Sequence, residues 1–204
     1  MRAAWVHTPM PTGLKRSTPM ALTPALSRIR GRGGNAVHVL LLADTHGSLD
    51  ARIAALAREC DIAVHAGDVG NAAVIDALVQ AGARVIAVRG NNDVPSRWPR
   101  GERHALDALE EIAEIELPGG TLIATHGDRY APAKRHARLR AGFSAARAVV
   151  YGHSHRLVID DAESPWILNP GAAGRARTYG GPSCLVLEAS EYAWRVEAQR
   201  FSRT

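Results

Sequence analysis

The sequence predicts an α/β protein in which two mixed β-sheets pack together and helices flank them. Between residues 37 and 93, short apolar runs alternate with segments of helical spacing, a pattern typical of βαβ units and a parallel sheet. Beyond residue 110, the apolar runs are separated by Gly and Pro turns, which indicates antiparallel strands. Polar residues follow many of these runs, as they do where open α/β sheets bind their ligands.

The first predicted strand is the apolar run from Val37 to Leu42, which suits a strand buried on both faces. It stops at an Asp-Thr-His-Gly sequence that begins at Asp44. Asp44 and His46 are two residues apart, so in extended backbone their side chains project to the same side. A carboxylate and an imidazole placed in this way form half of a site for a divalent metal. The alternative is that Asp44 only caps the helix that follows.

The later elements are predicted from the same periodicities. Leu49, Ile53 and Leu56 fall on one face of a predicted helix over residues 48–59, with Ser48 as its N-cap. Further helices are predicted over residues 71–81, 102–109 and 134–140. Strands are predicted over residues 61–66, 84–88, 148–151, a hairpin over 111–117 and 121–125, and a β-meander over 157–159, 166–168, 183–188 and 193–199.

The charge of the chain is unevenly distributed along its 204 residues. Of 25 Lys and Arg residues, six lie in residues 1–35, where there is no acidic residue. The remaining 19 face 20 acidic residues in 36–204, so the formal charge of +5 belongs to the N-terminal segment. The body therefore lacks the overall basic surface of nucleic-acid-binding proteins, and a nucleic-acid partner is not favoured.

Residues 1–35 are expected to be a disordered basic extension that precedes a single domain over 36–204. The segment contains four prolines and no periodic apolar face. An organellar transit peptide and translated upstream sequence are the alternatives. No apolar run approaches the ~20 residues of a membrane helix, so no membrane partner is expected. Cys60 and Cys184 form no CxxC motif, which favours a reducing, cytoplasmic location.

Metal-ligating residue types stand at the ends of five predicted strands. Carboxylate, imidazole and amide groups without a thiolate suit Mn, Fe, Zn or Ni better than copper(I) or an iron–sulfur cluster. A single histidine in such a loop has an ordinary explanation as a turn or surface residue, but five strand ends of this kind do not. The candidate ligands are Asp44, His46, Asp68, Asn91, His126, His153 and His155.

The ordered pattern D-x-H, G-D, G-N-x-D, H-G and G-H-x-H spans Asp44 to His155. It resembles the calcineurin-like metallophosphoesterase superfamily, and the small size, GNND and NPGA resemble its compact bacterial and archaeal phosphodiesterase branch. The resemblance implies a four-layer αββα sandwich over residues 36–204 that holds two divalent metal ions. Mn²⁺ is the expected metal, with Fe, Zn, Ni and Mg as alternatives.

The resemblance also implies a role for each ligand. Asp44, His46 and His155 would bind one metal, Asn91, His126 and His153 the other, and Asp68 would bridge them. A bridging carboxylate can hold two ions ~3.5–4 Å apart, with a water or hydroxide between them that attacks phosphorus.

Two further residues of the G-N-x-D motif are candidate catalytic residues, Asn92 and Asp93. Many family members have histidine or cysteine at the position of Asn92, and the histidine is thought to help the leaving group depart. An amide cannot act as a general acid near neutral pH. We therefore expect slow turnover or a preference for good leaving groups.

The expected function is hydrolysis of a small phosphoester or nucleotide-like substrate, most simply a phosphodiester. One alternative is a non-catalytic scaffold, as in the retromer subunit that shares this fold, and another is a nuclease that grips nucleic acid with the basic segment. All seven ligand positions hold competent residue types, which favours an enzyme over a scaffold. The sequence leaves open whether the chain forms a homo-oligomer.

Overall fold

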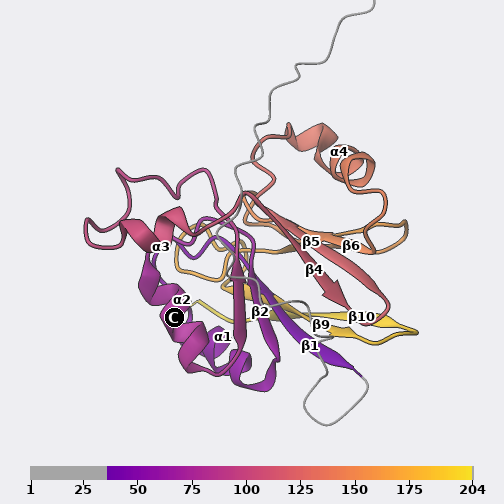
Figure 1. The fold of residues 1–204 in the computed structure, drawn as a ribbon, viewed down its shortest axis with the longest axis horizontal. Coiled ribbons are helices and arrows are strands. Elements are labelled where there is room, and N and C mark those ends of the chain that lie inside the picture. The colour runs from indigo at the N-terminus through magenta and orange to yellow at the C-terminus, as the bar shows by residue number, and fades with distance from the viewer. Residues whose placement is uncertain (1–35, 204) are drawn as a thin grey trace, which may run out of the picture.

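The computed structural model describes residues 36–203, which form two five-stranded β-sheets packed face to face with helices outside (Figure 1). The predicted fold class is therefore confirmed. The strand orders are β10-β9-β1-β2-β3 and β4-β5-β6-β8-β7. The strands are β1 (Val37–Leu42), β2 (Ile62–His65), β3 (Arg84–Ala87), β4 (Ile112–Leu117), β5 (Gly120–Thr125), β6 (Ala148–Val150), β7 (Leu157–Asp160), β8 (Trp166–Pro170), β9 (Ser183–Ala189) and β10 (Trp194–Arg200).

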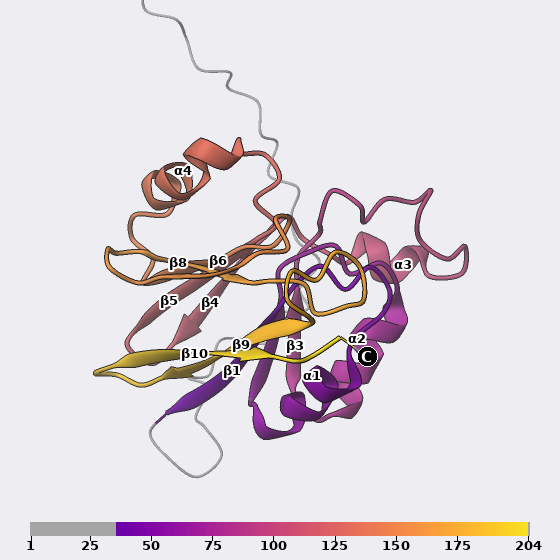
Figure 2. The same cartoon turned by 180° about the vertical axis from the view of Figure 1, so that it is seen from behind.

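Four α-helices and two short 3₁₀ helices complete the described part of the chain. The helices α1 and α2 cover the outer face of the first sheet, and α4 covers the second sheet from the opposite side (Figures 1 and 2). None of the helices in residues 36–203 is long and apolar enough to cross a lipid bilayer. The helices are α1 (Ala51–Leu56), α2 (Ala72–Gln80), α3 (Arg103–Asp107) and α4 (Arg135–Gly142), with 3₁₀ helices at Ala57–Glu59 and Pro132–Lys134.

The strands β1, β2 and β3 are parallel, as the strand–helix alternation predicts. The predicted N-cap of the first helix is wrong by two residues: Asp50, rather than Ser48, accepts a hydrogen bond from a backbone N–H of the first turn, that of Arg52, at 2.9 Å. Ser48 instead lies in a turn in which its N–H donates to Thr45 O. The second helix begins one residue after Asn71, whose side chain caps it.

The predicted β-meander at the C-terminal end of the chain is wrong. Of the four strands predicted to form it, β7 and β8 pair with each other in the second sheet, where β8 also runs parallel to β6. The β9–β10 hairpin returns to the first sheet, and β9 lies antiparallel to β1. Local periodicity identifies a strand but not its partner, and the residues of β9 that pair with β1 are about 150 positions away in the sequence. The expectations for residues 1–35 lie outside the described residues.

Side chains of β1 alternate between two hydrophobic cores, as expected for a strand buried on both faces. Val39 and Leu41 face the second sheet and pack in the core between the sheets. Leu40 and Leu42 point the other way and pack with Ile53 of α1. This strand is therefore packed on both faces up to Ala43, directly before the predicted ligands begin.

Candidate metal centre

The predicted ligands are carried by loops that follow β1, β2, β3, β5 and β6, so both sheets contribute. Backbone hydrogen bonds join these loops: Asp44 N donates to Gly67 O at 3.0 Å, His46 N to Asp68 O at 2.9 Å, and Gly152 N to His126 O at 3.2 Å. These backbone hydrogen bonds hold the loops together and so position the ligand side chains. The structure brings together all seven residues of the set Asp44, His46, Asp68, Asn91, His126, His153 and His155.

The backbone at these positions is strained. Within residues 36–203, six non-glycine residues have φ in the left-handed region, a conformation that costs a residue with a Cβ about 1–2 kcal/mol. Five of the six are predicted ligands, and the sixth is Arg177. Such clustering is typical of functional sites, because surrounding structure must compensate for the strain. The six are Asp44, His46, Asp68, His153, His155 and Arg177.

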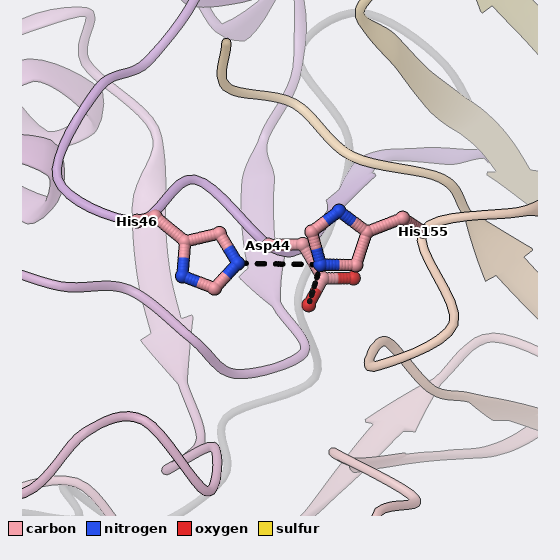
Figure 3. A group of neighbouring side chains, drawn as sticks. All are labelled: Asp44, His46 and His155. Atoms are coloured by element: carbon pink, nitrogen blue, oxygen red, sulfur yellow. Dashed lines mark hydrogen bonds and ion pairs between the residues drawn. The ribbon is translucent and has the colours of Figure 1, made fainter. Parts of the chain in front are cut away.

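Asp44, His46 and His155 form one group, with their side chains pointing toward one another (Figure 3). The Nε2 atoms of His46 and His155 are 3.2 Å apart, and His155 Nε2 lies 3.5 Å from Asp44 Oδ1. The Nδ1 of His155 lies 3.1 Å from Ala176 O. A carbonyl oxygen only accepts, so Nδ1 carries the proton and Nε2 offers its lone pair to the group.

Asp68, Asn91, His126 and His153 form the neighbouring group. The Nε2 of His126 lies 3.4 Å from Asp68 Oδ2 and 3.1 Å from Asn91 Oδ1. The same amide oxygen lies 2.9 Å from Nδ1 of His153. The Nδ1 of His126 donates to Ala66 O at 2.9 Å, which again directs Nε2 toward the site.

Burial lowers the pKa of His46, His153 and His155, whereas the pair formed by Asp68 and His126 behaves differently. Burial lowers the pKa of His126, but the hydrogen bond with Asp68 and the charges of Asp68 and Asp44 outweigh it, so that pKa is raised. Burial raises the pKa of Asp68, yet His126 and the two hydrogen bonds from Asn92 hold it below its usual range. Asp68 is therefore an ionised carboxylate although it is only 1% exposed.

The arrangement fits divalent cations. Nitrogen and oxygen atoms of His46, His126, His155 and Asp68 each lie 3.2–3.8 Å from another atom of this set, and each of these atoms can act as a ligand once it is deprotonated. Asp44 is fully buried, and its Oδ2 has no hydrogen-bond partner among the described residues. Burial raises the pKa of this carboxyl to about 7, because an unpaired carboxylate is costly in a protein interior. A cation at this point would remove that cost.

The two catalytic candidates serve Asp68 and the loops around it. Asn92 donates to Asp68 twice, from its backbone N–H at 2.8 Å and from Nδ2 at 2.6 Å. Asp93 is 1% exposed and accepts hydrogen bonds from Val69 N, Gly70 N, Gly90 N and Trp98 Nε1 at 2.8–3.1 Å. These four bonds occupy the Asp93 carboxylate and tie the surrounding loops together, and its catalytic role stays a prediction.

Sequence reasoning missed two features of the centre. Arg177, from the segment between β8 and β9, places Nη2 3.0 Å from His155 Nε2, and no motif marks this residue. A pocket of about 170 Å³ also lies beside Asn91 and His126, lined further by Arg89, Ile112, Tyr130 and Phe143. Its residues come from segments far apart in the chain, so only the three-dimensional structure defines it.

Comparison with known proteins agrees with this geometry. A family model described as the calcineurin-like phosphoesterase superfamily domain matches residues 37–192. A probable metallophosphoesterase of Methanocaldococcus jannaschii is 32% identical over 114 residues, which cover 55% of this chain and 53% of that protein. A phosphodiesterase of the same organism is 25% identical over 142 residues, covering 65% of this chain and 78% of that protein. The match with the first relative thus spans about half of its length.

Solved structures share the fold at low sequence identity. A single mutant of Vps29 from Entamoeba histolytica has a TM-score of 0.63 at 18% identity, covering 81% of this chain and 99% of that chain. An archaeal phosphodiesterase has a TM-score of 0.59 at 20% identity, covering 79% and 99%. The same architecture is therefore found in a named phosphodiesterase and in a protein named for vacuolar sorting.

Proposed function

Because the chain belongs to the calcineurin-like phosphoesterase superfamily, we propose that it is a phosphodiesterase that works with two divalent cations. The observation that carries the proposal is the position of Asp68. Its Oδ2 lies 3.8 Å from His46 Nε2 and 3.4 Å from His126 Nε2, between the two groups of ligands. A carboxylate at that point can serve both groups at once.

Asp44, His46 and His155 would hold one cation, Asn91, His126 and His153 the other, and Asp68 would bridge them. When bound, the cations would activate a water for attack on phosphorus and neutralise charge on the phosphoryl oxygens. The donor set suits Mn²⁺, which we propose as the working metal.

The protein groups around the cations have separate tasks. Asn92 fixes both oxygens of Asp68 by donating to each. The backbone N–H of His153 donates to Asp44 Oδ1 at 3.1 Å and holds that carboxylate across the two sheets. The pocket beside Asn91 and His126 would receive an organic group of a small phosphoester or nucleotide-like substrate. Its Tyr130 and Phe143 rings suit a planar or apolar group.

The test is hydrolysis of an activated aryl phosphodiester, bis(p-nitrophenyl) phosphate, by protein reconstituted with Mn²⁺. We expect turnover that stops in chelator and returns with added metal. Asp68→Asn should abolish turnover, whereas Asp107→Asn, on an exposed helix surface, should leave it unchanged. Full activity in the chelated protein would overturn the proposal.

A scaffold function is the second candidate, because the fold is shared with Vps29. A scaffold that has lost catalysis would fail to turn over any member of a panel of phosphomonoesters, phosphodiesters, cyclic nucleotides and nucleic acids, even when fully loaded with metal. The same panel compares a diester substrate with nucleic acid, and so tests the nuclease alternative.

A further inference from the structure

The segment between β8 and β9, residues 171–182, carries a cationic side chain to the first ligand group. Arg177 donates from Nη2 to Nε2 of His155 at 3.0 Å. Its guanidinium forms no ion pair with a carboxylate anywhere in residues 36–203. A neutral imidazole is a weak partner for a guanidinium, so the contact with His155 explains the position of Arg177 poorly. The charge of Arg177 also lowers the pKa of the buried Asp44 carboxyl, although burial outweighs this effect.

The segment holds Arg177 in a defined place. Its φ of 51° lies in the left-handed region, where arginine is strained. Ala176 O accepts from His155 Nδ1 at 3.1 Å, and Thr178 O accepts from Arg203 Nη2. Gly174 packs so closely on the loop after β1 that a Cβ there would lie 2.4 Å from Thr45 O. The residues on both sides of Arg177 are thus anchored, which compensates for its strain.

The contact with His155 cannot persist when that histidine binds a cation. Its Nδ1 carries the proton that bonds Ala176 O, so Nε2 has a single lone pair to give. A cation held by His155 needs the lone pair that Arg177 now uses. The guanidinium must then turn away from Nε2, while its anchored backbone keeps it at the edge of the site.

We propose that Arg177 is a substrate-binding residue whose guanidinium binds the non-bridging oxygens of the phosphoryl group. The assignment rests on the proposed function. The guanidinium is planar and presents its N–H donors in a fork that matches two phosphoryl oxygens. Arg177 therefore supplies a positive charge from the protein for the anionic phosphoryl group. The metal ligands cannot do so, because they are nitrogen and oxygen donors to the cations.

Inorganic phosphate is the probe for this assignment, and Arg175 offers a matched control. Arg175 is exposed on the same segment, two residues earlier. Calorimetry first measures the Mn²⁺ affinity of each protein, and then the phosphate affinity of the Mn²⁺-loaded protein. The proteins compared are wild type, Arg177→Gln, Arg177→Lys and Arg175→Gln. We expect Arg177→Gln to weaken phosphate binding at least about tenfold, in line with loss of charge-assisted hydrogen bonds. Arg177→Lys should be intermediate, and Arg175→Gln should stay within about twofold of wild type.

The Mn²⁺ titration distinguishes two roles of Arg177, namely binding the phosphoryl group and holding His155 in place for metal binding. Arg177→Gln should bind Mn²⁺ as tightly as wild type or more tightly, because the competing donor to Nε2 is gone. Equal phosphate affinity in fully loaded Arg177→Gln and wild type would refute the assignment alone. A parallel loss of Mn²⁺ affinity would also refute it, in favour of a purely structural role. A wild-type protein that takes up no Mn²⁺ would refute the proposed function and, with it, the assignment.

Discussion

Replacing Asp93 by asparagine should destabilise the protein strongly. Each oxygen of the Asp93 carboxylate accepts two hydrogen bonds, Oδ2 from Val69 N and Gly90 N, and Oδ1 from Gly70 N and Trp98 Nε1. The amide of Asp93→Asn keeps one acceptor oxygen, so two buried N–H groups lose their partner and face an NH₂ donor. Each costs about 1–3 kcal/mol, which gives about 4 kcal/mol in total. For a domain of this size, that lowers Tm by roughly 8–16 °C.

Thermal unfolding followed by circular dichroism measures this effect, with Asp107→Asn as the control. Asp107 is exposed and pairs with Arg103 on the surface of α3, so Tm should change by less than about 2 °C. Well below its Tm, the metal-loaded Asp93→Asn protein should retain turnover within about tenfold of wild type. A variant with wild-type Tm and turnover reduced more than a hundredfold would show that Asp93 takes part in the chemistry and that our reasoning is wrong.

Three other predictions follow from the described contacts. Burial lowers the pKa of His65 to about 4, so the unfolded chain binds a proton at this residue before the folded protein does as pH falls. Between pH 7.5 and 5, the free energy of unfolding, measured in urea at each pH, should therefore fall by about 2 kcal/mol more in wild type than in His65→Gln. Parallel plots of unfolding free energy against pH for the two proteins would refute this. Asp68→Asn should lose more activity and more bound metal than His46→Ala, because Asp68 Oδ2 faces both ligand groups; equal metal content in the two variants, by atomic emission, would contradict the bridging role. Asn92→His should flatten the dependence of rate on leaving-group pKa, because the histidine adds a general acid that can raise the rate for poor leaving groups by up to about 10²–10⁴-fold. Identical slopes for wild type and Asn92→His, measured with a series of aryl and alkyl esters, would exclude Asn92 from the mechanism.

The composition of the candidate site could be predicted from the sequence because its signals are local. Asp44 and His46 directly follow an apolar run, and Asp68 and Asn91 stand in the same relation to β2 and β3. Parallel strands bring their carboxyl ends to one edge, so strand order alone places these residues together. The helix α2 was similarly predictable, since Asn71 caps it and its apolar residues recur at helical spacing.

Partner choice and side-chain bonding were not predictable, because neither leaves a local signal. Nothing in Ser183–Ala189 indicates that this strand pairs with β1 and leaves the neighbouring β7–β8 hairpin in the other sheet. Asp93 shares a motif with Asn91 and Asn92, yet only the three-dimensional structure shows that its carboxylate accepts hydrogen bonds from backbone N–H groups. Arg177 is one of many arginines in the sequence, and its role depends on a backbone conformation that the sequence does not encode in any short motif.

The position of β1 has a consequence for how the protein is made. This strand lies in the middle of the first sheet, between β2 and β9, and its first residue, Val37, pairs with Ala189. During synthesis, one side of β1 therefore stays an open edge until β9 (Ser183–Ala189) has left the ribosome. Pairing between strands that are far apart in the sequence slows folding. In the meantime, the unpaired edge of the apolar strand β1 can pair with other chains, which leads to aggregation. Nascent chains truncated before Ser183 should accordingly depend on chaperones, however well their first helices and strands have formed.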